Sequence, residues 1–179
     1  MRTIENWNAN VHQKVLKTLP LRLQKDLVEF PPPKKLPKLQ SYFIHGNAGV
    51  GKTVLAARLY MEAKKQHYLN PCPDHILFLS TSEFFNELKS SFNNSELDEQ
   101  VILAKYSEAE FLVLDDLGSE RSTEWVMSML YLLINRRYES MLTTIITSNY
   151  DLDELDEKLD DVRIPSRIGR MCKVLNPVR

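Results

Sequence analysis

Residues Phe43 to Thr53 read FIHGNAGVGKT, and this stretch decides the fold. From Gly46 to Thr53 it fits G-x-x-x-x-G-K-[ST], the pattern of a phosphate-binding loop. The surroundings suit this pattern, because the apolar run Ser41–His45 predicts a strand before it and Thr53–Lys65 predicts a helix after it. Backbone amides of such a loop surround the β-phosphate, and the helix N-terminus adds partial positive charge. The sequence therefore predicts an ATP site.

The loop is expected to bind the nucleotide along its whole length, and two of its side chains have additional roles. The residues expected to bind the nucleotide are Gly46, Asn47, Ala48, Gly49, Val50, Gly51, Lys52 and Thr53. Lys52 is expected to reach the β- and γ-phosphates, and the Thr53 hydroxyl to ligate Mg²⁺. The alternative is a glycine-rich turn that binds nothing, and the placement between a strand and a helix argues against it.

A second motif, FLVLDD, supplies two acids. Four consecutive apolar residues, Phe111 to Leu114, predict a strand that is buried on both faces. At its carboxyl end, where open α/β sheets bind ligands, Asp115 is expected to hold Mg²⁺, usually through water, and Asp116 to orient or deprotonate the attacking water. The alternative is a pair of solvated turn acids.

For two further candidate residues, the sequence pattern alone leaves two roles open. Asn149 follows the predicted strand Thr144–Thr147, and it either holds the lytic water or γ-phosphate or belongs to a helix-capping turn. Arg167 follows a predicted acidic helix, Asp151–Asp161. It either stabilises the transferring phosphoryl group of a neighbouring subunit or pairs with the acids of that helix.

The rest of the chain alternates between strand and helix patterns. Further strands are predicted at His75–Leu79 and Lys173–Leu175. Helices are predicted at Ser80–Leu88, which opens with a Ser80–Glu83 capping box, and at Glu96–Glu108 and Thr123–Tyr138. This alternation predicts an α/β fold of three layers around a central parallel five-stranded sheet.

A helix and a linker are predicted before the ATPase domain. The apolar spacing of Val11–Val28 predicts a helix that Pro20 interrupts or restarts, and Pro31-Pro32-Pro33 with Pro37 predicts a stiff linker. The expected division is therefore residues 1–38 as helix and linker and residues 39–179 as the ATPase domain.

The composition excludes several classes of protein. A net charge of −1 gives no overall cationic field for nucleic acid or membrane, so any such contact is local. Two cysteines, Cys72 and Cys172, show no paired spacing for a disulfide framework or zinc site. Without an export signal or an apolar run that could span a bilayer, a cytoplasmic protein is expected.

The order of motifs resembles the DnaC/IstB-like branch of the AAA+ ATPases, which includes replicative helicase loaders and transposition helper ATPases. The stretches that carry the resemblance are residues 43–53, 111–118 (FLVLDDLG), 135–138 (NRRY), 144–149 (TIITSN) and 166–168 (SRI). The resemblance implies that Asn149 is the sensor-one residue and Arg167 the arginine finger acting in trans. Arg163 and Arg170 flank Arg167 and are candidates to substitute for it.

The resemblance also implies a function: a helicase loader in DNA replication that self-associates, contacts a replicative DNA helicase and binds single-stranded DNA. The alternatives are a transposition helper ATPase and a nucleotide-dependent assembly switch with negligible turnover. Small size and near-neutral charge favour the loader. Three phenylalanines, Phe84, Phe85 and Phe92, either stack on bases or pack internally. Lys34, Lys35 and Lys38 are either phosphate contacts or part of a solvated linker.

The chain departs from the pattern of the family in two respects. The segment before the ATPase core is short and holds no cluster of zinc ligands. The chain also ends soon after its last predicted strand, so little or no C-terminal helical lid is expected, and Arg179 is the candidate for a second sensor. With so little to cover the adenine, weak nucleotide affinity is expected.

Overall fold

Five parallel strands form the centre of the computed structural model, which describes residues 9–30, 36–69, 75–93, 98–121 and 123–177. The strands are β1 (Tyr42–His45), β2 (Ile76–Ser80), β3 (Phe111–Leu117), β4 (Thr143–Ser148) and β5 (Lys173–Leu175). Their order across the sheet is β2-β3-β4-β1-β5, and each neighbouring pair is parallel. The predicted α/β class with a parallel five-stranded sheet is confirmed.

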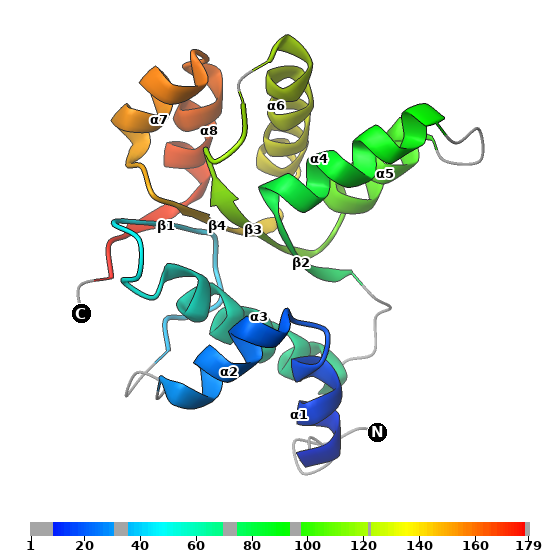
Figure 1. The fold of residues 1–179 in the computed structure, drawn as a ribbon, viewed down its shortest axis with the longest axis vertical. Helices are drawn as coiled ribbons and strands as arrows, with labels where there is room; N and C mark the ends of the chain where they lie inside the picture. Colours follow the sequence, from blue (N-terminus) through cyan, green and yellow to red (C-terminus); the bar gives the residue numbers. More distant parts are fainter. Residues whose placement is uncertain (1–8, 31–35, 70–74, 94–97, 122, 178–179) are drawn as a thin grey trace.

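Helices cover both faces of the sheet (Figure 1). The helices are α1 (Ala9–Leu16), α2 (Leu21–Glu29), α3 (Lys52–Leu69), α4 (Thr81–Ser90), α5 (Glu99–Ser107), α6 (Glu124–Glu139), α7 (Leu152–Leu159) and α8 (Arg163–Met171), with a short 3-10 turn, η2 (Ser91–Asn93). Helix α3 packs on one face with α1 and α2, and α4 to α8 pack on the other. The molecule is therefore a three-layer sandwich.

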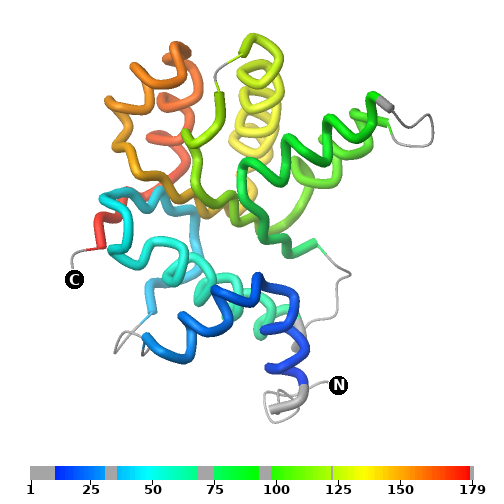
Figure 2. Tube along the Cα trace, in the orientation of Figure 1, coloured from blue at the N-terminus to red at the C-terminus, as the bar shows by residue number. Residues whose placement is uncertain are grey.

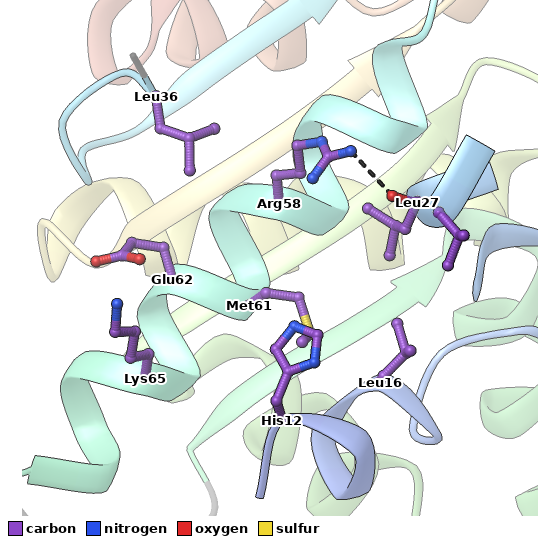
Figure 3. Close-up of a pocket in the computed structure, with 9 residues that line it drawn as sticks. His12, Leu16, Leu27, Leu36, Arg58, Met61, Glu62 and Lys65 are labelled. Carbon is purple, nitrogen blue, oxygen red and sulfur yellow. Dashed lines mark hydrogen bonds between the residues drawn. The ribbon is translucent and has the colours of Figure 1, made fainter. Parts of the chain in front are cut away.

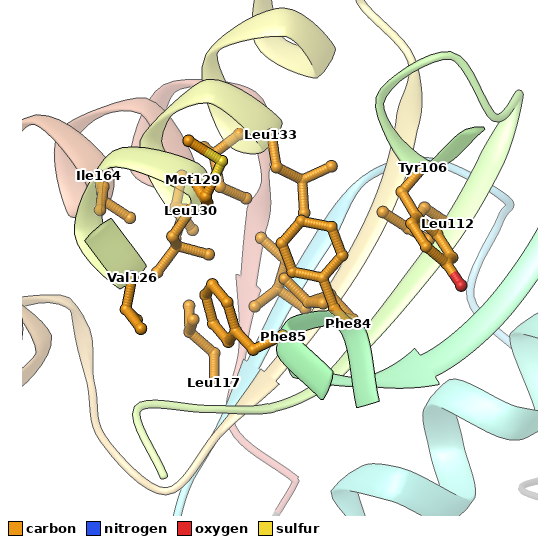
Figure 4. Packing of buried hydrophobic residues seen from close by; sticks show 14 of the residues in the cluster. Phe84, Phe85, Tyr106, Leu112, Leu117, Val126, Met129, Leu130, Leu133 and Ile164 are labelled. Carbon is orange, nitrogen blue, oxygen red and sulfur yellow. The ribbon is translucent and has the colours of Figure 1, made fainter. Parts of the chain in front are cut away.

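The larger of the two apolar cores lies between the sheet and helices α4 to α8 (Figure 4). Phe84 and Phe85 of α4 are buried in it, with exposed fractions of 0% and 3%. For these two residues, internal packing is therefore confirmed and stacking on DNA bases is excluded, because neither ring is accessible. Phe92 differs, since it is 60% exposed.

The N-terminal helices lie against α3, far from them in sequence (Figure 2). Pro20 separates α1 from α2, as predicted, because it lacks the N–H that a continuous helix needs. Arg58 of α3 donates from Nη2 to the carbonyl oxygens of Leu27, at 3.1 Å, and Phe30 at the end of α2. A cavity of about 280 Å³ remains between α1, α2 and α3 (Figure 3). Lys34 and Lys35 of the linker lie outside the described residues.

Helix α8 is absent from the sequence prediction, and α7 is shorter than predicted. Pro165 and Gly169 make α8 a poor helix by intrinsic propensity. Burial of Ile164 and Ile168 against the core outweighs that propensity. Asp160, at the end of α7, adopts a left-handed conformation with φ of +52°, and this ends the acidic helix before Asp161.

For the cysteines and for membrane-spanning segments, the structure gives information only within the described residues. Cys172 is buried with a free thiol, and burial raises its pKa to about 12. Cys72 lies outside the described residues. Within the same ranges, no helix combines the length and the apolar character needed to cross a bilayer.

Arg137 of α6 is fully buried and joins three elements. Its guanidinium donates to Thr144 Oγ1 at 2.9 Å, Tyr106 O at 2.8 Å, Ala109 O at 2.7 Å and Thr143 O at 2.8 Å. Burial lowers the pKa of Arg137 to about 9, so the side chain stays charged at neutral pH. The cation also faces the last turn of α5, where the helix dipole is negative. Arg137 therefore ties α5 and α6 to the sheet.

Arg137→Leu is expected to lower the free energy of unfolding by about 3 to 5 kcal/mol. The variant leaves several buried carbonyl oxygens without a donor, and each such group carries a desolvation cost. Urea unfolding measures the change. Arg136→Leu, at the neighbouring half-buried position, is the control and should change stability by about 0.5 kcal/mol or less. Equal losses in the two variants would contradict the role given to Arg137.

Candidate nucleotide-binding site

The loop between β1 and α3 has the backbone that the motif predicts. Gly46 has φ of +138° and Gly51 has φ of +91°, conformations that residues with a side chain rarely adopt. A Cβ at Gly51 would meet nothing within 4 Å, so its glycine is explained by backbone conformation rather than by lack of space. The loop leads directly into α3, which begins at Lys52.

The side chain of Lys52 is hydrogen-bonded to this loop, and the residue is only 7% exposed. Its Nζ donates to Gly46 O at 2.7 Å, Asn47 O at 2.9 Å and Asn149 Oδ1 at 2.8 Å. Burial lowers the pKa of Lys52, and the nearby carboxylates of Asp116 and Asp115 oppose that change. The ammonium group therefore lies between the loop and the carboxyl ends of β3 and β4.

Asp115 lies opposite Thr53 at the end of β3. The Thr53 hydroxyl donates to Asp115 at 2.9 Å (Oδ1), and the Thr147 hydroxyl donates to the same oxygen at 2.6 Å. Burial raises the pKa of Asp115, although the two hydroxyl groups stabilise the carboxylate. These contacts exclude the alternative of a solvated turn acid. A hydroxyl and a carboxylate at hydrogen-bond distance form a donor set that suits Mg²⁺.

Asp116 occupies an irregular point in the sheet. The β3–β4 register shifts between Leu114 and Leu117, and Asp116 has φ of +61°. Its backbone N–H donates to Thr147 Oγ1 at 2.9 Å. This bulge turns two consecutive carboxylates to the same edge of the sheet, whereas a regular strand would send them to opposite faces.

Asn149 connects the basic and acidic parts of the site. Its Oδ1 accepts from Lys52, and its Nδ2 donates to Asp116 Oδ1 at 3.2 Å. The helix-capping alternative belongs to another residue, because the side chain of Asp151 caps α7. Asn149 thus contacts residues from both motifs.

Thr147 is a site residue to which the sequence pattern assigned no role beyond a small polar group at the end of its strand. It is 1% exposed, and its single hydroxyl orders both Asp115 and the backbone of Asp116. The feature of the sequence that could have identified Thr147 is its position at the end of β4, which lies between the strands that carry the two motifs. A β-branched residue there is equally typical of an ordinary buried strand, so the pattern alone did not reveal the hydroxyl contacts.

Thr147→Val is expected to lower kcat for ATP hydrolysis about tenfold, because the isosteric change removes one hydroxyl that orders two candidate site residues. Steady-state ATPase assays measure the effect. Thr143→Val makes the same chemical change at the other end of β4 and is the control. Comparable activity in both variants would show that Thr147 does not order the site.

Arg167 lies apart from these residues, on α8. Its guanidinium donates to Asn135 Oδ1 and to Tyr131 Oη at 2.9 Å, both on α6. The ion pair with an acid that sequence reasoning allowed for Arg167 is made instead by Arg163, which lies 2.7 Å from Asp161. The fold therefore unites the two motifs and Asn149 within one chain and leaves Arg167 on α8, in contact with α6.

Comparisons with known proteins agree with this architecture. The chain matches the family model described as IstB-like ATP binding protein over residues 36–174. It is 30% identical over 151 residues to the replicative helicase loader DnaI of Bacillus subtilis (strain 168), covering 79% of this chain and 46% of that protein. It is 23% identical over 138 residues to the replicative helicase loader DnaC of Escherichia coli (strain K12), covering 76% and 54%.

A solved structure of the DnaC helicase loader has a TM-score of 0.65 and 25% identity to this chain, covering 95% of this chain and 100% of that one. The chain spans about half the length of the two curated relatives.

Proposed function

Because the chain belongs to the family of IstB-like ATP-binding proteins, we propose that it is a magnesium-dependent ATPase that acts as a replicative helicase loader. One observation carries the enzymatic part of this proposal. Hydrogen bonds join groups from three separate segments at one edge of the sheet. Asn149 accepts from Lys52 and donates to Asp116, and the neighbouring Asp115 accepts from Thr53.

The binding roles follow from the chemistry of each group. Loop residues 46–53 bind the phosphates through backbone amides, and Lys52 exchanges its protein acceptors for phosphate oxygens. Thr53 and Asp115 would hold Mg²⁺, which when bound offsets charge on the phosphate oxygens. This assignment rests on the hydroxyl and carboxylate that the fold brings to 2.9 Å.

The hydrolytic roles belong to residues beside that pair. Asp116 orients the attacking water and accepts its proton, and Asn149 holds the water or the γ-phosphate from the side. The hydrogen bond from Asn149 to Asp116 supports this pairing. Arg167 stabilises charge on the phosphoryl group bound by a neighbouring copy, since its own contacts lie on α6 and α8 rather than in the loop.

The loader role draws its support from the relatives. DnaI and DnaC are both named replicative helicase loaders, and this chain aligns with each over more than three quarters of its own length. The partners proposed are therefore a replicative DNA helicase, further copies of this chain and single-stranded DNA. Phe92 is the exposed ring among the three phenylalanines considered for base stacking.

A pull-down tests the partner. The tagged chain with ATP and Mg²⁺ is expected to retain a replicative helicase and not a transposase, and the reverse result would favour the transposition helper. Lys52→Ala is the control, because retention that depends on nucleotide should disappear when the loop lysine is lost.

An ATPase assay with and without single-stranded DNA tests the enzyme. Turnover that DNA stimulates would exclude a pure assembly switch, whereas binding of ATP with no turnover under either condition would contradict the ATPase proposal. Equal nucleotide binding by the parent chain and Lys52→Ala would overturn the assigned site itself.

A further inference from the structure

The guanidinium of Arg167 is fixed by neutral oxygens. It donates from Nε to Asn135 Oδ1, from Nη2 to Tyr131 Oη at 2.9 Å and from Nη1 to Arg163 O at 3.2 Å. The guanidinium carbon also lies 4.7 Å from the centre of the Tyr131 ring. An amide, a phenol, a backbone carbonyl and a ring face therefore orient the cation without cancelling its charge.

The neighbouring arginine is held in the opposite way. Arg163 donates from Nε and Nη2 to the two carboxylate oxygens of Asp161 at 2.8 and 2.7 Å. This bidentate pair lowers the pKa of Asp161. Arg163 lies over the same tyrosine ring, at 4.4 Å. Its charge is therefore matched locally, although it lies one helical turn from Arg167 on α8.

The acceptor on α6 is itself oriented. Asn135 Nδ2 donates to Glu139 Oε1 at 3.0 Å, and this fixes which end of the amide faces Arg167. Tyr131, Asn135 and Glu139 are spaced four residues apart, so they occupy one face of α6. That face packs beside α8.

We propose that Tyr131 and Asn135 are positioning residues for Arg167, and that Asp161 keeps Arg163 from taking its place. The inference rests on the proposed function, in which Arg167 acts in trans. A cation that meets a phosphoryl group in a neighbouring subunit is most effective when it is already oriented and carries its full charge. Contacts with neutral oxygens meet both conditions, whereas a carboxylate partner would meet only the first.

A mixing experiment separates positioning from ordinary stabilisation. In the donor chain, Lys52→Ala disables the phosphate loop and leaves Arg167 in place. In the acceptor chain, Arg167→Ala removes the finger and leaves the loop intact. Each chain alone is expected to be nearly inactive, and the equimolar mixture is expected to regain ATPase activity.

Asn135→Ala is then introduced either into the donor chain or into the acceptor chain. In the donor it is expected to lower kcat of the mixture about tenfold, with KM for ATP unchanged, because the nucleotide is bound by the other chain. In the acceptor, where residue 167 is already alanine, the fall should be far smaller. Equal falls in both arms would overturn the inference, since a loss of folding acts wherever the substitution is placed.

Graded substitutions in the donor test the two contacts of Tyr131. Tyr131→Phe keeps the ring and loses the hydroxyl acceptor, and it should lower kcat about tenfold. Tyr131→Ala loses both contacts and should lower it further. Arg163→Ala in the donor should change kcat by about twofold or less, because this partly exposed arginine is already paired. A loss with Arg163→Ala as large as that caused by removing Arg167 would make Arg163 the finger and refute the assignment.

Different results would refute the trans role of Arg167 and the positioning role of its neighbours. If the donor and acceptor, each without any further substitution, do not restore activity together, the trans role of Arg167 is wrong, and the inference is refuted with it. If they do restore activity but Asn135→Ala and Tyr131→Phe have no effect in the donor, only the positioning role is refuted.

Discussion

Asp116→Asn is expected to lower kcat for ATP hydrolysis by about 10²- to 10⁴-fold, the range typical for loss of a general base. The substitution removes the basic oxygen and little else. Asparagine tolerates left-handed backbone, so the φ of +61° at this position is not a barrier. The asparagine oxygen can also still accept the hydrogen bond from Asn149. Single-turnover hydrolysis measures the rate, and a fluorescent ATP analogue measures the affinity.

Two results decide this prediction. ATP affinity should stay within a few-fold of the parent, because the phosphates are bound by the loop and Lys52. Asp116→Ala is a less informative companion, because alanine in a left-handed conformation adds backbone strain to the chemical loss. Hydrolysis by Asp116→Asn within about threefold of the parent would show that another group accepts the proton.

Arg167→Ala is expected to lower kcat by about 10³-fold or more, the effect typical of a lost arginine finger. The reason is electrostatic, since the guanidinium stabilises charge that develops in the transition state. ATP affinity should be retained, because the described contacts of Arg167 lie on α6 and α8. In the parent chain, activity should rise more steeply than linearly with protein concentration, and in Arg167→Ala that dependence should disappear.

Two companion variants sharpen the Arg167 prediction. Arg167→Lys should not restore activity, because an ammonium group cannot reproduce the planar contacts of the guanidinium with Asn135 and Tyr131. Arg170→Ala removes an exposed arginine from the same helix and is the matched control. A comparable loss with Arg170→Ala, or full activity in Arg167→Ala, would contradict the proposed role.

Local sequence predicted the strands, most helices and the groups at the sheet edge. The loop glycines and the apolar run before Asp115 carry information within a few residues, since backbone conformation and strand burial depend on near neighbours. The capping box of Ser80 and Glu83 is present as predicted, for the same reason. Helix α8 escaped prediction because its stability comes from buried Ile164 and Ile168, and burial depends on contacts with distant elements.

The site shows the same division. The sequence predicted Asp116 and Asn149 as candidates, but only the fold revealed the hydrogen bond between them and the hydroxyl of Thr147 behind both acids. The positive φ of Asp116 depends on the register of β3 against β4, which no local pattern encodes.

The sequence by itself determined the fold class and the chemical groups of an ATP site, because the phosphate loop and the paired aspartates are short motifs with local physical meaning. Only the tertiary structure decided how those groups meet and which contacts orient Arg167 on α8. Arg163 pairs with Asp161, two residues away, and lies over the Tyr131 ring, whereas Arg167 donates to Tyr131 and Asn135. The contacts of Arg167 depend on how α8 packs beside α6 on one face of the sheet, and that packing brings together residues that are distant in the chain.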